Sequence, residues 1–327
     1  MDQLLSLAAE NLISPIILSF VLGVVASMAR SDLSIPEAVA KGMSIYLLFA
    51  IGFKGGVSVA AHGIDGRLGL ALLSGIILSF GLPLIAFGLL RVMTRMDRLD
   101  AAAVAAHYGS ISIVTFVAAT SVLESQGIAS EGYMVAVAAA MEAPAILSAL
   151  WLVARGGGSD ARGMDSTLIR EIMLNGSIVL LVGSFFIGWA TGEDGLSEIA
   201  PFIVSPFKGV LCLFLLDMGL VAGRGLRDGG RILGPGVLAF GVLMPLIGSV
   251  GGLGFGLALG LSTGGIALMM VLSASASYIA VPAAMRVALP EANPSLYLTL
   301  SLGVTFPFNL TLGIPLYVAV AQVMSGG

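Results

Sequence analysis

The chain contains a long series of apolar stretches, each long enough to cross a lipid bilayer, separated by short polar breaks. A helix needs about 20 apolar residues to cross a hydrocarbon core of about 30 Å. The stretches that meet this requirement are 12–29, 36–59, 67–93, 101–123, 132–154, 168–191, 201–222, 231–259, 264–288 and 294–325. The predicted fold class is therefore all-α and integral to the membrane, with ten transmembrane helices.

Composition supports this prediction and narrows the function. Hydrophobic residues make up 57% of the chain and charged residues 10%, too few to coat a soluble protein. A single cysteine, Cys212, rules out a disulfide framework, and the only histidines are His62 and His107, which argues against a multi-histidine metal centre. The net charge of −4 and the lack of a basic cluster do not suggest a nucleic-acid partner.

No catalytic pattern is found in the apolar stretches. Neither a spacing of Ser with His, nor paired Asp, nor an HExxH-type metal motif occurs there. The sequence thus predicts a protein that is not an enzyme and has no cofactor.

The Lys and Arg residues predict an orientation. If the N-terminus is outside, twelve of the fifteen fall on the cytoplasmic side, and the three outside are Lys54, Arg67 and Lys208. Such a bias is the positive-inside rule. We expect a multi-pass protein of the cell (inner or plasma) membrane with both termini outside.

An internal repeat divides the chain into halves. Residues 41–52 match 208–219 at an offset of 167, and the matches 83–85 with 245–247 and 110–112 with 275–277 follow in order. The predicted domains are a first five-helix repeat (1–154), a cytoplasmic linker (155–167) and a second five-helix repeat (168–327). Because five is odd, the second repeat is inverted, which is typical of secondary transporters.

Two predicted spans are unusually polar and are counterparts of each other. Residues 107–115 and 273–282 carry clustered hydroxyls, and Gly109 and Pro282 can interrupt their helices. Two discontinuous helices crossing there would direct half-helix amides and serine hydroxyls at one point, which favours an anion site without a fixed charge. The alternative is that small residues here serve only close helix packing.

Carboxylates inside the spans are candidate ion sites. Glu142, two residues before Pro144, and Asp217 could bind sodium or carry a proton. The alternative is an interhelical hydrogen bond or a salt bridge to a residue such as Lys54. In the last span, Thr305, Pro307 and Asn309 form a polar break at the position equivalent to Glu142, whereas His107 is expected at a membrane interface.

Several segments together resemble a known family. Residues 273–282, the loop 288–295 with its Pro-x-Ala-Asn-Pro-Ser pattern, and 313–322 are similar to the C-terminal signature of the SbtA-type sodium-dependent bicarbonate transporters. Residues 109–115, 142–144 and 218–219 are also similar. The resemblance covers nearly the whole chain except the linker, which is shorter than the family's cytoplasmic insertion.

The resemblance implies sodium symport of bicarbonate through a homotrimer. The substrate site would contain Ser110, Ser112, Thr115, Ser273, Ser275, Ser277 and Tyr278. Sodium, the only metal ion expected, would lie beside them near Glu142, Gly109, Thr305 and Asn309, with Asp217 and Lys54 as a possible charge relay. The short linker leaves a PII-like regulator an open question.

The chain departs from the family at several of these positions. Tyr278 stands where the family has an Asp, and Glu142-Ala143-Pro144 replaces Asp-x-Pro. Lys54 and Asp217 lie about a turn from the family's charged positions. The leading prediction is sodium-coupled symport of bicarbonate or a similarly small anion by alternating access. The alternatives are a sodium- or proton-coupled transporter of a small carboxylate, and a passive anion channel or receptor.

Overall fold

The computed structural model describes residues 13–63, 66–154, 170, 174, 176–229, 234–279, 281–282, 284–285 and 289–326. The predicted linker, 155–167, lies outside these residues. Throughout the described part, the regular elements are helices and none is a strand. In chain order they are α2 (Pro15–Met28), α3 (Glu37–His62), α4 (Gly66–Met93), α5 (Arg98–His107), α6 (Ile113–Ser125), α7 (Met134–Ala140), α8 (Glu142–Ala154), α10 (Gly176–Ile203), α11 (Phe207–Gly229), α12 (Pro235–Ala258), α13 (Thr263–Ser273), α15 (Pro294–Leu300), the π-helical η1 (Ser301–Thr305), α16 (Phe306–Phe308), the π-helical η2 (Asn309–Gly313) and α17 (Ile314–Met324).

Six helical segments of the described chain are long and apolar enough to cross a membrane. They are Glu37–Ala61, Gly66–Met93, Met134–Val153, Phe207–Arg227, Pro235–Ala258 and Pro294–Met324. Leu18, Val25, Leu73 and Ile77 are examples of large apolar side chains that remain exposed on α2 and α4, as expected of helices that face lipid. The chain is an all-helical membrane protein; the number ten stays a prediction.

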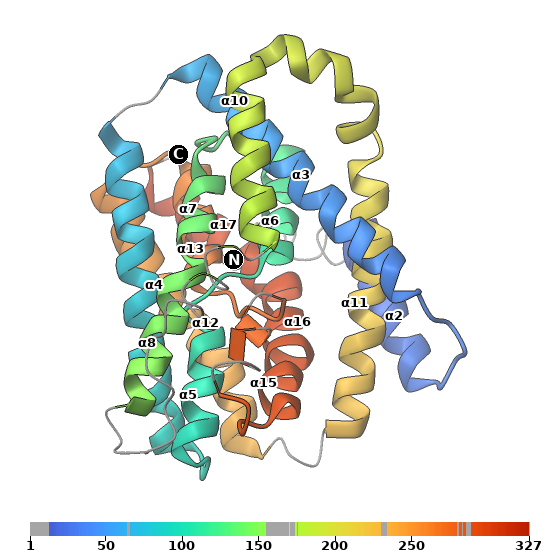
Figure 1. Ribbon diagram of the computed structural model, residues 1–327, viewed down its shortest axis with the longest axis vertical. Coiled ribbons are helices and arrows are strands. Elements are labelled where there is room, and N and C mark those ends of the chain that lie inside the picture. Colours follow the sequence, from blue (N-terminus) through green and yellow to red (C-terminus); the bar gives the residue numbers. More distant parts are fainter. Residues whose placement is uncertain are drawn as a thin grey trace.

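The helices form two groups (Figure 1). We call α2, α3, α10 and α11 the four-helix group; in it α2 packs along α11, and α3 along α10. The second group contains α4, α5, α8, α12, α13 and α17, where α12 packs on α13, and α4 on both α5 and α8. In Figure 1, α11 and α2 lie at the right edge and α4 and α8 at the left.

The predicted boundaries are least accurate around α10. The sequence predicts spans at 168–191 and 201–222 with a loop between them, whereas α10 continues to Ile203 after a kink at Gly192. Gly192 has φ 59° and ψ −149°, a conformation that glycine adopts without a steric penalty. The first helical part therefore ends at Gly192, and a second helical part follows it directly where the sequence predicted a loop.

Four other predicted spans are interrupted, and the ninth span is interrupted after α13. The fourth is divided into α5 and α6, which lie in the lower and upper halves of Figure 1. The fifth is divided at Met141 into α7 and α8, and Pro144 lies in the first turn of α8, where a missing N–H costs little. The last is loosened by the π-helical segments on either side of α16, which are frequent at functional sites.

Candidate functional site

The two predicted helix breaks meet inside the protein. We call residues 108–112, between α5 and α6, the first break, and residues 274–279, after α13, the second break. The amide of Ser277 donates a hydrogen bond of 2.7 Å to the carbonyl oxygen of His107, the last residue of α5. Two segments that are 170 residues apart in sequence thus share one buried junction.

The first break contacts a carboxylate. The Ser110 hydroxyl donates to Oε2 of Glu142 at 3.0 Å, and the Glu142 side chain is buried at the start of α8. Glu142 forms no ion pair within the described part of the chain. A buried carboxylate is costly unless a cation, a proton or several donors compensate it, so this group is suited to bind a small cation or to carry a proton.

Ser112 begins helix α6. Its hydroxyl oxygen accepts hydrogen bonds from the Thr115 amide at 3.2 Å and from the Thr115 hydroxyl at 2.8 Å. This N-cap satisfies one of the amides that a helix start leaves without an intrahelical partner. The α6 start, with its partial positive charge, is thereby held at the junction.

The second break contacts a neutral amide. Nδ2 of Asn309 donates to the carbonyl oxygen of Ala274 at 2.8 Å, and its Oδ1 accepts from the Tyr317 hydroxyl at 3.0 Å. The Ser275 hydroxyl donates to the carbonyl oxygen of Val271 at 2.6 Å. The buried Ser273 hydroxyl forms no hydrogen bond with a described residue.

Thr305 connects the last span to the first break. Its hydroxyl lies 2.6 Å from the Tyr108 hydroxyl and donates to the carbonyl oxygen of Gly241 on α12 at 2.7 Å. Thr305 is fully buried. The three predicted ion-site side chains, on Glu142, Thr305 and Asn309, therefore each contact one of the breaks or their adjoining residues.

Tyr278 lies in the second break and faces the first. Its hydroxyl is beside Ser112 but forms no hydrogen bond of good geometry there. Its ring packs edge-on against Phe306, with ring centroids 5.4 Å apart, and Phe306 packs in turn on Phe20 of α2 at 5.3 Å. An aromatic layer thus joins the junction to the four-helix group.

Two glycines allow the breaks to lie against their neighbours. A Cβ atom at Gly109 would overlap the Pro83 ring of α4, and one at Gly248 of α12 would overlap the Ser273 carbonyl. Gly109 therefore has a packing role in the structure. Its predicted part in a cation site is untested.

Asp217 and Lys54 belong to the four-helix group and not to the breaks. Asp217 is buried on α11, and its nearest charge influence is Arg224 on the same helix. Lys54 forms a salt bridge of 2.7 Å with Glu124. The ion pair weighed from the sequence, between Lys54 and Glu142 or Asp217, is not the one that the structure forms.

The placement of His107 at a membrane interface is wrong. His107 is fully buried, its Nδ1 lies 2.6 Å from the Ala103 carbonyl oxygen, and its ring stacks on Tyr297 at 4.3 Å. Two site residues, Tyr108 and Tyr317, were not predicted from the sequence, although they contact Thr305 and Asn309. Their positions, next to Gly109 and eight residues after Asn309, are the signal that was available.

A model of the Na+-dependent bicarbonate transporter superfamily matches residues 15–322, nearly the whole chain. No curated protein matches the sequence. The matched range contains both breaks and all the residues named above.

Proposed function

The chain belongs to the Na+-dependent bicarbonate transporter superfamily, as the resemblance predicted, and we propose that it couples sodium entry to the uptake of bicarbonate or a similarly small anion. Membership of a transporter family also means that the chain is not an enzyme. The observation that carries the proposal is the buried junction of two helix breaks, with hydroxyls on both and a carboxylate beside one.

The anion site in this proposal is the junction itself. The hydroxyls of Ser110, Ser112, Thr115, Ser273, Ser275, Ser277 and Tyr278 are all buried there. Hydroxyls and the α6 start can bind one negative charge without a buried Lys or Arg. The Ser273 and Tyr278 hydroxyls, which have no hydrogen-bond partner among the described residues, could donate to an oxyanion.

The cation site in this proposal is centred on Glu142. Sodium prefers oxygen ligands, and the Glu142 carboxylate, the backbone around Gly109 and the polar atoms of Thr305 and Asn309 are the candidates. Thr305 and Asn309 are both buried. Bound sodium would compensate the Glu142 charge, so substrate anion and cation would stabilise each other at one junction.

Alternating access is supported by the helix pairs. Under the proposed inverted repeats (1–154 and 168–327, joined by the linker 155–167), α2 corresponds to α10 and α3 to α11. A two-fold exchange of the repeats converts the α2–α11 pair into the α10–α3 pair, and both pairs are among the closest in the fold. We propose that this four-helix group and the second group move relative to each other, with ten spans and both termini outside.

Other parts of the proposal rest on the family alone. The homotrimer and the location in the cell membrane are of this kind. The burial of Asp217 supports the proposed charge relay between Asp217 and Lys54. Lys54 would have to leave its salt bridge with Glu124 before it could take part in this relay.

Uptake of radiolabelled bicarbonate into proteoliposomes tests the proposal. We expect accumulation when an inward sodium gradient is imposed at fixed pH, and none when potassium replaces sodium. Empty liposomes and liposomes with the Ser112→Ala/Ser275→Ala variant are the controls. Absence of sodium-driven accumulation by folded wild-type protein would contradict the proposal.

A second candidate is a proton-coupled transporter of a small carboxylate. The absence of an ion pair to Glu142 in the described chain favours it, because a proton compensates a buried carboxylate as well as sodium does. Uptake that needs no sodium and rises as external pH falls would identify this function. Dissipation of the pH gradient with a protonophore would then abolish uptake.

A further inference from the structure

A cavity lies between the four-helix group and α6. Its volume is about 310 Å³, and since a water molecule occupies about 30 Å³, it has room for a small oxyanion with part of its hydration shell. It is lined by the start of α2, the end of α6, the first turns of α11 and the last span, and its lining includes Ala118, Ser121, Lys208, Cys212 and Leu310.

Positive potential in this cavity comes from α11. Lys208 is the second residue of that helix, whose first turn contains no acidic residue. A cation there lies where the helix dipole already places positive partial charge, an unfavourable position unless an anion is near. Lys208 forms no ion pair with any described residue.

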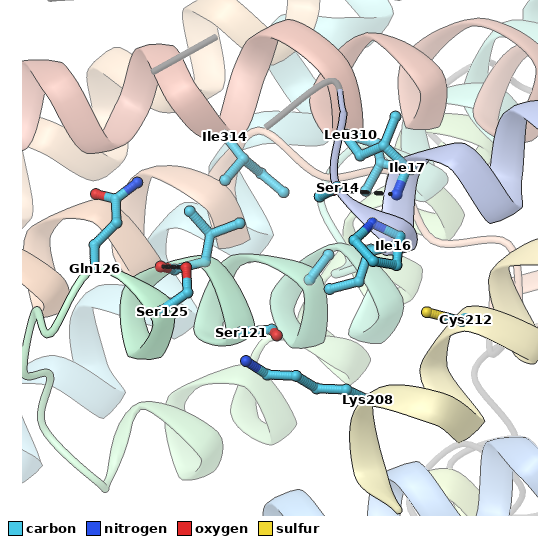
Figure 2. Close-up of a pocket in the computed structure, with 13 residues that line it drawn as sticks. Ser14, Ile16, Ile17, Ser121, Ser125, Gln126, Lys208, Cys212, Leu310 and Ile314 are labelled. Atoms are coloured by element: carbon cyan, nitrogen blue, oxygen red, sulfur yellow. Dashed lines mark hydrogen bonds between the residues drawn. The ribbon is translucent and has the colours of Figure 1, made fainter. Parts of the chain in front are cut away.

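The opposite wall supplies a free donor. Ser121 on α6 is 2% exposed, and its hydroxyl has no hydrogen-bond partner in the described chain. A buried hydroxyl without a partner is destabilising, and a ligand that forms a hydrogen bond with it would remove this cost. In Figure 2 the Lys208 side chain extends toward Ser121 across the cavity.

Among the described residues, the nearby charges leave the cavity positive. Glu124, three residues after Ser121, is paired with Lys54 at 2.7 Å, so its negative charge is compensated. Lys54 in turn lies over the ring of Phe207, the neighbour of Lys208, at 5.4 Å.

The cavity also approaches the junction. Ala118 lies three residues after Thr115 on α6, and Leu310 follows Asn309 directly. We propose that this cavity is an anion-binding vestibule, in which Lys208, the α11 start and Ser121 hold a small oxyanion before it passes to the junction. That the oxyanion is the transported bicarbonate rests on the proposed function; binding in the cavity does not.

Cys212 reports on the site directly. It is the only cysteine of the chain, it lines the cavity, and it lies one helical turn after Lys208. The test measures how fast purified protein in detergent reacts with an anionic and with a cationic methanethiosulfonate reagent, sulfonatoethyl and trimethylammonioethyl, each corrected for its rate with a free thiol. Cys212→Ser defines the background.

The expected result is faster labelling by the anionic reagent. We expect Lys208→Met to lower the anionic-to-cationic ratio at least about fivefold, and Lys41→Met, at the repeat counterpart outside the cavity, to leave it unchanged. Potassium bicarbonate should slow the reaction of Cys212 with the anionic reagent more than potassium gluconate of equal ionic strength does. Ser121→Ala should weaken this protection of Cys212 by bicarbonate.

Two results would overturn the inference: a ratio that Lys208→Met does not change, or equal protection by bicarbonate and gluconate. Failure of the proposed function has a different signature. Wild-type protein would then show bicarbonate protection of Cys212 but no sodium-driven uptake in proteoliposomes.

Discussion

The two helix breaks occupy equivalent places in the proposed repeats but contact different side chains. The first break donates from Ser110 to the carboxylate of Glu142, whereas the second accepts from the amide of Asn309 at Ala274. Glu142 and Asn309 are separated by 167 residues, the same offset that relates the repeats. The pair shows that two similar breaks can contact one ionisable and one neutral side chain, so that under the proposed function only the first break would hold the cation.

Neutralising the carboxylate is expected to have the largest effect. Glu142→Gln keeps the size of the side chain but removes the charge. Because a hydrogen bond to a charged group contributes about 1.5–3 kcal/mol, we expect the sodium concentration for half-maximal uptake to rise about 10- to 100-fold. Sodium-titrated uptake in proteoliposomes measures this.

Glu124→Gln is the matched control for that variant. Glu124 forms a solvent-accessible pair with Lys54, and such pairs contribute at most about 1 kcal/mol, so sodium dependence should change less than about fivefold. If folded Glu142→Gln protein keeps the wild-type sodium dependence, Glu142 does not bind the cation and the two breaks do not differ in this respect.

Glycine-to-alanine substitutions test whether the two breaks pack equally tightly against their neighbouring helices. Gly109→Ala and Gly248→Ala would each force a methyl group into an occupied position, and overpacking costs about 1–3 kcal/mol. Both variants should therefore unfold at a lower temperature in detergent. Gly88→Ala on α4 and Gly254→Ala on α12, where an added Cβ meets nothing within 4 Å, should not; normal unfolding of Gly109→Ala would show that the first break tolerates repacking.

Exchanging the side chains at positions 142 and 309 tests whether either break can hold the cation. Asn309→Asp loses the donor to Ala274 when its carboxyl is ionised, which we expect to lower the free energy of unfolding by about 1–2 kcal/mol. The double variant Glu142→Gln/Asn309→Asp should not recover sodium-dependent uptake. Recovery would mean that either break can hold the cation.

The smallest expected effect is at Tyr278. Since its hydroxyl forms no hydrogen bond of good geometry with a described residue, Tyr278→Phe should leave the unfolding temperature unchanged while raising KM for bicarbonate about 2- to 10-fold, the value of one hydrogen bond. Tyr317→Phe, which loses a bond to Asn309, should instead lower stability. A Tyr278→Phe variant with wild-type KM would exclude the phenol as an anion ligand.

Local sequence signals predicted most of the fold accurately. The apolar runs correspond to the long helices, because a membrane helix satisfies its own backbone and needs only length and apolarity. Clustered hydroxyls with Gly109 and Pro282 predicted both breaks. The predicted span end at 191 coincides with the kink at Gly192, but the segment after it, predicted as a loop because it carries three acidic residues, is helical to Ile203.

What the sequence determined by itself is the class of protein, the positions of the breaks and the family, since hydropathy and motif order are properties of the chain alone. Tertiary packing alone decided which groups the breaks contact. The Ser277–His107 bond, the burial of His107 and the convergence of Lys208 and Ser121 on one cavity join residues far apart in sequence. Their distances depend on how the helices pack, and no local pattern records that.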